Sequence, residues 1–236
     1  MRLDKLLANS GFGSRKDVKK LLKQGGVRVD GETVKDAKVH VDPETQEVLV
    51  YGERVEYKEF IYLMMNKPKG VISATEDLEH RTVIDLLEET EAMFEPFPVG
   101  RLDKDTEGFL LLTNDGKLSH ELMSPKKNVK KTYEAVVLGE VNEEDIEAFK
   151  EGVTLDDGYV TKPADLVILS TGPTSVIQLT ITEGKFHQVK RMFLSRGKRV
   201  LELKRLSIGN LILDETIPLG GYRKLTEKEL SILRGE

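Results

Sequence analysis

The feature that most constrains the fold of this chain is a run of four large apolar residues at 109–112, which is followed by Asn-Asp-Gly at 114–116. A short apolar run closed by turn-forming residues is typical of a buried β-strand that ends in a tight turn. Before it, residues 101–107 form a dense polar segment, Arg-Leu-Asp-Lys-Asp-Thr-Glu, between Gly100 and Gly108. The sequence therefore predicts a charged loop held by a core strand, an arrangement on which proteins often mount reactive groups.

Composition narrows the class of protein. The chain has 236 residues, of which 39% are hydrophobic and 33% charged, as in ordinary globular proteins of one or two domains. It contains no cysteine, which excludes disulfide bonds, thiolate metal sites and a cysteine nucleophile, and its 4 histidines are scattered, which argues against a structural zinc site. The N-terminus is charged from Arg2 onward and no apolar run approaches membrane length, so we expect no signal peptide, no membrane contact and a cytoplasmic location.

The net charge of −5 hides a segregation of charge along the chain. Residues 1–41 hold ten Lys and Arg against five Asp and Glu, and residues 185–205 hold eight against one, Glu202. A third basic cluster occupies residues 126–131. Any one cluster could be the solvated face of a helix, but three of them on a mildly acidic chain predict a basic surface for a polyanion such as nucleic acid.

The first 50 residues predict two short helices and a small hairpin. Apolar residues at helical spacing begin at Leu3, and Ser14 with Asp17 three residues later forms the capping box of a second helix. An Asp-Gly pair at 30–31 follows an alternating strand and predicts a tight turn. The further elements expected before residue 60 are strands at 38–41 and 47–50 and a linker at 52–58. The basic residues that lie off the apolar stripe of the second helix are Arg15, Lys16, Lys19 and Lys20.

From residue 60 onward the sequence predicts many strands and few helices without regular βαβ alternation. This pattern favours an α+β fold with a mixed or antiparallel sheet. The expected strands are 61–65, 109–112, 132–138, 164–169, 176–182 and 200–206. The expected helices are 82–87, 117–123, 142–150, 187–196 and a last one capped by Thr226 and Glu229.

The N-terminal pattern of two short helices, the second of them basic, and a hairpin resembles the S4 RNA-binding domain. The residues that carry this resemblance are 2–7, 14–15, 27–31 and Val34. Such a module is small for a core of its own, so it usually accompanies a larger domain.

Three separated segments of the larger part of the chain resemble the RsuA-type pseudouridine synthases, the branch of that family that acts on ribosomal RNA. They are 100–108 (Gly-Arg-Leu-Asp-Lys-Asp-Thr-Glu-Gly), 131–135 (Lys-Thr-Tyr-Glu-Ala) and 183–193 (Glu-Gly-Lys-Phe-His-Gln-Val-Lys-Arg-Met-Phe). The Lys-Pro-Lys-Gly sequence at 67–70 and the S4-like head also match that branch. The resemblance covers essentially the whole chain.

This resemblance implies an S4-like RNA-binding domain and linker at 1–58 and a pseudouridine synthase catalytic domain with a mixed or antiparallel sheet at 59–236. The implied reaction converts a uridine within RNA to pseudouridine by breaking the N1–C1′ bond, turning the base and rejoining it through C5, without cofactor or metal. The implied partner is ribosomal RNA or a ribosomal assembly intermediate, bound by a monomer.

The resemblance assigns Asp103 as the catalytic carboxylate. Breaking a glycosidic bond builds positive charge on the sugar, which an ionised carboxylate stabilises or captures. Whether Asp103 attacks C1′ or removes a ribose proton stays open. To remain ionised where water is excluded, Asp103 needs a nearby cation. Lys190 suits this role because it flanks the apolar stripe marked by Val189 and Phe193, and the family has Lys or Arg at this position; the alternative is a lysine at the edge of the core.

The resemblance also supplies the other candidates. Tyr133 is expected to stack on the flipped base and to assist proton removal at C5, although an aromatic residue at the start of a strand is often a core residue. Arg101 matches the position that holds the place or the phosphate of the flipped-out nucleotide. Arg191 points away from Lys190 on the predicted helix and suits a phosphate contact. The remaining candidates for RNA contact are Lys185, His187, Lys67 and Lys69.

Several alternatives are compatible with parts of the sequence. In the simplest, Asp103 and Asp105 only accept hydrogen bonds from turn amides. A non-catalytic RNA-binding protein would explain the basic clusters but not an acid among them. A glycoside hydrolase or a metal-dependent nuclease could use the Asp-x-Asp pair, although the chain has no tryptophan for stacking on sugars. Among ribosomal targets, the sequence at 187–192 favours the small subunit, and the large subunit is the alternative.

Overall fold

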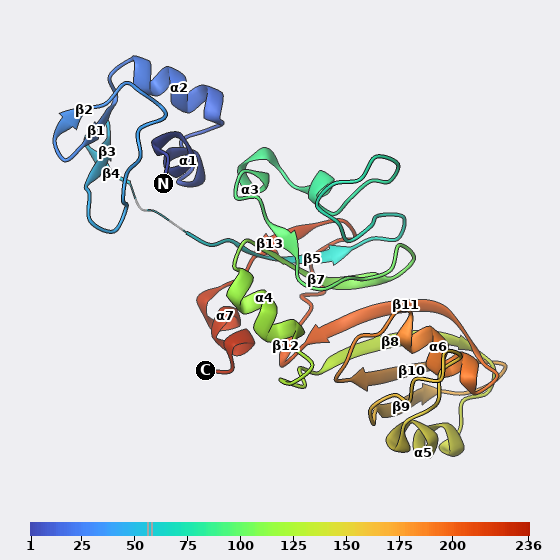
Figure 1. The fold of residues 1–236 in the computed structure, drawn as a ribbon. Coiled ribbons are helices and arrows are strands. Elements are labelled where there is room, and N and C mark those ends of the chain that lie inside the picture. The colour runs from blue at the N-terminus through green and yellow to red at the C-terminus, as the bar shows by residue number, and fades with distance from the viewer. Residues whose placement is uncertain (56, 58) are drawn as a thin grey trace. The chain divides into compact units, whose positions relative to one another are not determined.

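The computed structural model describes residues 1–236 with the exception of residues 56 and 58 (Figure 1). The chain divides into two compact units. Unit 1 is formed by Met1–Ile61 and Leu87–Pro96, and unit 2 by Tyr62–Leu86 and Phe97–Glu236. The domain boundary predicted between residues 58 and 59 stays a prediction, and residue 58 lies outside the described part of the chain.

Unit 1 combines two helices with a small antiparallel sheet. Its main elements are α1 (Leu3–Asn9), α2 (Arg15–Lys23), β1 (Val27–Val29), β2 (Glu32–Thr33), β3 (Val48–Val50) and β4 (Glu53–Arg54), and the strand order is β2-β1-β3-β4. The predicted capping box of α2 is confirmed: Ser14 Oγ accepts from the Asp17 N–H, and the Asp17 carboxylate accepts from the Ser14 N–H. Apolar side chains of both helices pack with the valines of β1 and β3 into one core.

The turn predicted at 30–31 is confirmed. Asp30 and Gly31 have φ angles of 50° and 83° and join β1 to the antiparallel β2. Two successive residues with positive φ are the signature of the tight turn whose twist matches that of the flanking strands.

Two other predictions in unit 1 are wrong in part. The segment at 38–41 is not a strand, because its neighbourhood caps α1 instead: the first N–H groups of the helix, from Leu3 and Asp4, donate to the carbonyls of Val39 and Ala37. The linker predicted at 52–58 starts too early, since β4 pairs with β3 in a hairpin.

The segment Leu87–Pro96 belongs to unit 1 although it lies far along the chain. It contains the short helix α3 (Glu89–Ala92). Met93 packs against the core of unit 1, and the carboxylate of Glu95 lies 2.7 Å from Lys5 Nζ. The sequence pattern gives no indication of this association.

Unit 2 is built on a nine-stranded sheet. The strands are β5 (Tyr62–Lys67), β6 (Phe97–Pro98), β7 (Glu107–Thr113), β8 (Lys131–Leu138), β9 (Asp165–Ser170), β10 (Thr174–Ile181), β11 (Arg199–Ile208), β12 (Leu211–Ile212) and β13 (Tyr222–Lys224). The main path has the order β13-β5-β7-β11-β8-β10-β9, with β12 paired to β11 and β6 to β7. The β7–β11 pair is parallel and the other pairs are antiparallel, so the predicted α+β class with a mixed sheet is confirmed.

The helices of unit 2 are α4 (Gly116–Met123), α5 (Glu143–Glu151), α6 (Gln188–Ser195) and α7 (Glu227–Arg234), with a 3₁₀ turn η1 (Ile84–Leu86) where a helix was expected at 82–87. The tight turn predicted at 114–116 is wrong. Asp115 is the N-cap of α4, because its carboxylate accepts from the Leu118 N–H and Gly116 is the first helical residue. β7 therefore runs almost directly into a helix.

The central strand β7 is buried as predicted. Phe109 and Leu111 are fully buried in a core that includes Leu118 and Leu122 of α4 and Leu230 of α7. Further along the sheet, α6 packs against β11. Among the described residues, no helix is long and apolar enough to cross a membrane.

Candidate active site

The loop that carries Asp103 is anchored by a buried lysine. Lys67 is the last residue of β5 and has no exposed surface; its Nζ donates to the carbonyl oxygens of Pro68, Asp103 and Thr106, each at 3.0 Å. Three acceptors match the three protons of an ammonium group. Burial lowers the pKa of Lys67 to about 8, against the opposing negative charges, first among them that of Asp103.

The prediction that Lys67 contacts RNA does not fit this geometry. The side chain is covered, and its ammonium group already has three protein acceptors. Lys67 is instead an internal support that fixes the backbone of the loop on both sides of Asp103.

A second contact fixes the same loop. Ser73 Oγ donates to the Leu102 carbonyl and accepts from the Leu102 N–H, both at 3.0 Å. The Gly70 N–H donates to the Lys104 carbonyl at 2.8 Å. The residues before and after Asp103 are thus held by hydrogen bonds, so its side chain projects from a rigid backbone.

The structure places Lys190 beside Asp103. Its Nζ lies 3.1 Å from Asp103 Oδ2 and 2.6 Å from Asp105 Oδ1. The buried face of α6 includes Val189 and Phe193. With that face in the core, Lys190 reaches the loop that carries Asp103. Burial alone would lower the pKa of Lys190, but its hydrogen bonds to Asp105 and Asp103 and their charges raise it. The lysine is therefore a stable positive charge beside the carboxylate.

His187 closes the other side of the carboxylate. It is the N-cap of α6 with a left-handed φ of 49°, and its Nε2 lies 3.6 Å from Asp103 Oδ1. Its ring stacks on that of Phe186, with centroids 3.8 Å apart and planes inclined by 20°. Asp103 thus lies between a lysine and a histidine from the same helix start.

The register of the sheet places Tyr133 in the same row of paired residues as Gly108, which ends the Asp103 loop. Paired residues across neighbouring strands face the same side of a sheet. The pairs Lys67–Gly108, Gly108–Arg205 and Arg205–Tyr133 form one row across β5, β7, β11 and β8. Tyr133 is 8% exposed, two positions along this row from the glycine that ends the Asp103 loop.

Arg205 is a member of this row that the sequence analysis did not identify. It is 2% exposed, its Nε donates to the Phe109 carbonyl at 2.7 Å, and its Nη2 has no hydrogen-bond partner among the described residues. Burial, with a contribution from the charge of Arg205, lowers the pKa of the neighbouring Lys131 to about 8. The sequence offers a signal for this burial. Side chains alternate between the two faces of a strand, so Arg205 shares a face of β11 with Leu203 and Ser207, and all three are buried.

A buried network around Glu183, also missed, supports the start of α6. Tyr159 Oη donates to Glu183 Oε2 at 2.6 Å, and Gln188 Nε2 donates to Glu183 Oε1 at 2.9 Å. The Lys185 N–H donates to Gln188 Oε1 at 2.8 Å. These hydrogen bonds therefore fix the turn that contains His187.

The remaining candidates of unit 2 are dispersed. The guanidinium group of Arg191 is engaged by the carboxylates of Asp156 and Asp157, so a phosphate would have to compete with them. Lys185 Nζ lies 4.4 Å from the centre of the Tyr159 ring. Lys69 Nζ is 3.9 Å from a carboxylate oxygen of Glu202.

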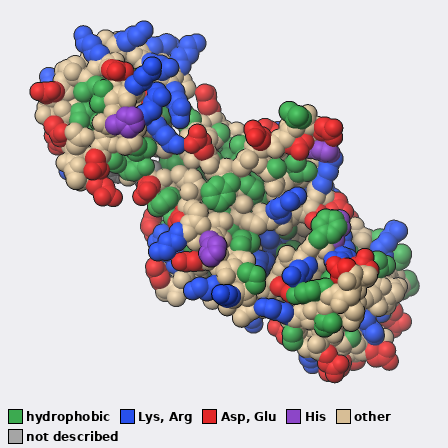
Figure 2. Space-filling model, in the orientation of Figure 1, with side chains coloured by type: hydrophobic (Ala, Val, Ile, Leu, Met, Phe, Trp, Pro, Cys, Tyr) green, Lys and Arg blue, Asp and Glu red, His purple; other side chains and the backbone are tan. Residues whose placement is uncertain are grey.

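Two groups of candidates are accessible. Arg101, at the start of the loop, is exposed. The basic side chains of α2 in unit 1 are all exposed, and Figure 2 shows Lys and Arg gathered over that part of the unit; they are Arg15, Lys16, Lys19 and Lys20.

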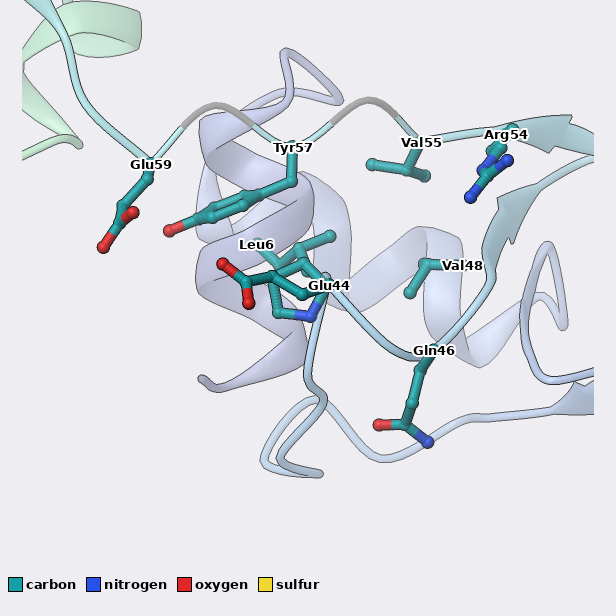
Figure 3. Close-up of a pocket in the computed structure, with 9 residues that line it drawn as sticks. Leu6, Glu44, Gln46, Val48, Arg54, Val55, Tyr57 and Glu59 are labelled. Atoms are coloured by element: carbon teal, nitrogen blue, oxygen red, sulfur yellow. The ribbon is translucent and has the colours of Figure 1, made fainter.

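One pocket of the molecule lies outside this arrangement. Unit 1 has a pocket of about 600 Å³, which Figure 3 shows with Tyr57, Glu44 and Arg54 at its walls. Its mixed charge gives no reason to assign it a reaction. Within the described part of the chain, no group of three or more His, Asp or Glu side chains is arranged to hold a metal ion.

Comparison with known proteins shows the family of this chain. The family model for RNA pseudouridylate synthase matches residues 61–195, more than half of the chain and the whole of the Asp103–Lys190 arrangement. The chain belongs to the RNA pseudouridylate synthase family. It is an RNA pseudouridine synthase, an isomerase, and the S4 domain model matches residues 1–47 at its N-terminus.

Relatives resemble this synthase over nearly its whole length. An uncharacterized RNA pseudouridine synthase of Bacillus subtilis, YtzG, is 60% identical over 99% of this chain and 98% of its own. A ribosomal small subunit pseudouridine synthase A of Yersinia pestis is 39% identical over 98% of this chain and 97% of its own, and a ribosomal large subunit pseudouridine synthase B of Bacillus subtilis is 40% identical over 99% of this chain and 95% of its own. A crystal structure of a pseudouridylate synthase has a TM-score of 0.70 at 37% identity and covers 99% of both chains.

Proposed function

We propose that this synthase isomerises a specific uridine of ribosomal RNA with Asp103 as its catalytic carboxylate. The observation that carries the proposal is the 3.1 Å contact between Lys190 Nζ and Asp103 Oδ2 on a loop braced by Lys67. A carboxylate paired with an ammonium group keeps its charge when RNA covers the site.

The reaction proceeds in a protected site. The target uridine leaves the RNA stack and enters the site, where Tyr133 provides a ring against its base. As the N1–C1′ bond breaks, positive charge grows on the sugar, and the Asp103 carboxylate stabilises or captures it. The freed uracil turns and C5 bonds to C1′, while any bond from Asp103 to C1′ breaks. C5 then loses its proton and N1 gains one, so the product is an isomer of the substrate. Lys190 Nζ lies 3.1 Å from the Asp103 carboxylate and places a positive charge beside it.

Substitution of Asp103 tests this assignment. We expect Asp103→Asn to abolish release of tritium from RNA that carries [5-³H]uridine while RNA binding is retained, because the amide keeps the shape but loses the charge. Asp105→Asn is the matched control: its side chain is 70% exposed and also contacts Lys190, yet it should retain most of the activity. Full activity of Asp103→Asn would refute the role, and activity in excess chelator distinguishes the reaction from metal-dependent cleavage.

We further propose that the target lies in small-subunit ribosomal RNA, on the strength of the sequence at 187–192. The large subunit is the second candidate, because relatives whose names specify either subunit are about equally similar to this chain. Pseudouridine mapping of both ribosomal RNAs from cells with and without the gene decides between them. We expect one missing site in the small subunit; loss of a large-subunit site selects the alternative, and loss of neither refutes a ribosomal target.

A further inference from the structure

Phe186 is an exposed aromatic ring next to the catalytic carboxylate. Its side chain is 75% exposed. One face of its ring stacks on His187, whose Nε2 lies 3.6 Å from Asp103 Oδ1. Because His187 covers one face, the exposed surface includes the opposite face.

Specific contacts fix the backbone that carries this ring. Arg191 Nη1 donates to the Phe186 carbonyl at 3.3 Å, while the same guanidinium group is bound by Asp156 and Asp157. The preceding residue is fixed by the hydrogen bond from the Lys185 N–H to Gln188 Oε1. The ring therefore extends from a fixed backbone, so little backbone entropy remains to be lost when a ligand stacks on it.

We propose that the free face of Phe186 stacks on a nucleobase of the RNA strand that adjoins the flipped uridine. The proposal rests on the proposed function, because it places the neighbouring nucleotide beside the nucleotide that Asp103 acts on. Removing a base from a stack exposes the faces of its neighbours, and an aromatic side chain next to the site replaces part of the lost stacking. The basic residues 185–205 supply the charge that attracts the strand.

Side chains of graded chemistry separate stacking from simple apolar contact. Phe186→Ala should weaken binding to transcripts of small- and large-subunit ribosomal RNA by about 5- to 150-fold, the range for loss of one stacked base. Phe186→Tyr keeps a π face and should bind like the unaltered protein, whereas Phe186→Leu keeps the apolar bulk and should bind like Phe186→Ala. Equal binding by all variants, or rescue by Leu, would overturn the proposal.

Fluorescence provides a direct readout, because the chain contains no tryptophan. In the Phe186→Trp variant the indole should be strongly quenched when RNA binds, since a nucleobase lies against its face. Leu138→Trp is the matched control: Leu138 is 48% exposed at the end of β8, five residues along the strand from Tyr133, and its fluorescence should change little.

The two proposals fail separately. No quenching of the Phe186→Trp variant at RNA concentrations that saturate filter retention would overturn the stacking proposal. Quenching without tritium release by the unaltered protein would leave the stacking intact and contradict the ribosomal target of the proposed function.

Discussion

Gly108, the residue that ends the Asp103 loop, lies where two strands approach each other closely. Its φ is +101°, and a Cβ at this position would lie 2.7 Å from the backbone nitrogen of Arg205 and closer still to its carbonyl oxygen. The parallel pairing of β7 with β11 depends on this approach, because Gly108 is paired with Arg205. A side chain here would separate the strand of the Asp103 loop from the strand next to Tyr133.

We therefore expect Gly108→Ala to destabilise the protein by about 3 kcal/mol or more, through overpacking and a strained backbone. Urea unfolding of the purified variant measures the change. Gly116→Ala is the control: Gly116 lies in the first turn of α4 with open space around it, so alanine should stabilise by about 0.5–1 kcal/mol. Similar effects at both positions would contradict the packing argument.

Lys67 supports the backbone of Asp103, and this role can be tested. Lys67→Met keeps the length of the side chain but removes the donor to three carbonyls, so we expect a loss of about 2–5 kcal/mol in the free energy of unfolding. Single-turnover activity, measured where the variant remains folded, should also fall because the loop is less well held.

Lys69→Met is the comparison for this variant. Its side chain is 42% exposed and 3.9 Å from Glu202, so the change should stay within about 0.5 kcal/mol. If Lys67→Met were as stable and active as Lys69→Met, the support role would be wrong.

At the scale of elements, the start of α7 is held by an ion pair that gives a defined pH response. Arg223 donates to both carboxylate oxygens of Glu229, at 2.8 and 2.7 Å, and Glu229 also caps the helix with Thr226. The hydrogen bonds from Arg223, the largest cause, lower the pKa of Glu229 from 4.5 to about 2.

A lowered pKa stabilises the folded state above the unfolded-state value. Both states are ionised above pH 4.5; as the pH falls from 4.5 toward 2, the unfolded state binds a proton that the folded state does not, and stability is lost. We expect Glu229→Gln to remove about 1–2 kcal/mol of this dependence, after allowance for solvent screening. Urea unfolding at several pH values measures the slope, and Glu227→Gln, at an exposed position in the same turn, should retain it.

Long elements were predictable and very short ones were not. The buried run at 109–112 and the capping boxes at Ser14 and Thr226 carry local signals, and the structure contains the corresponding elements. Strands β6, β12 and β13 have two or three residues, too few for a period. They exist because a longer strand lies beside them, which the local sequence does not encode.

The candidate site likewise contains residues that local sequence patterns predict and residues that they do not. The helical stripe at Val189 and Phe193 indicates where Lys190 points, but the burial of Lys67 was not predictable. A lysine next to Pro68 is typical of a surface turn, and two of its three acceptors come from Asp103 and Thr106, which are distant along the chain. Arg205 was missed because its significance depends on strand register.

At the scale of the whole molecule, the exposed basic residues of α2 predict a contribution of unit 1 to RNA affinity. Replacing Arg15, Lys16, Lys19 and Lys20 together by Gln should weaken binding, and it should make the slope of log K against log salt shallower by up to about 3 if all four contact phosphate. Filter binding over a range of salt concentrations measures both quantities.

The matched control changes two exposed lysines elsewhere in unit 1, Lys35→Gln with Lys38→Gln, and should leave the slope nearly unchanged. An equal effect per charge removed in both variants would indicate a response to net charge rather than contact at α2.

The return of Leu87–Pro96 to unit 1 affects any attempt to dissect the molecule. The chain crosses between the units three times, so a single cut near residue 58 does not separate them cleanly. A fragment starting at residue 59 would keep Met93 but lose the leucines and valines against which it packs. The segment around Met93 would then be exposed and apolar, which favours aggregation. Aggregation or low activity of such a fragment would then result from the loss of the unit 1 core that covers Met93, and would not show that the reaction requires unit 1.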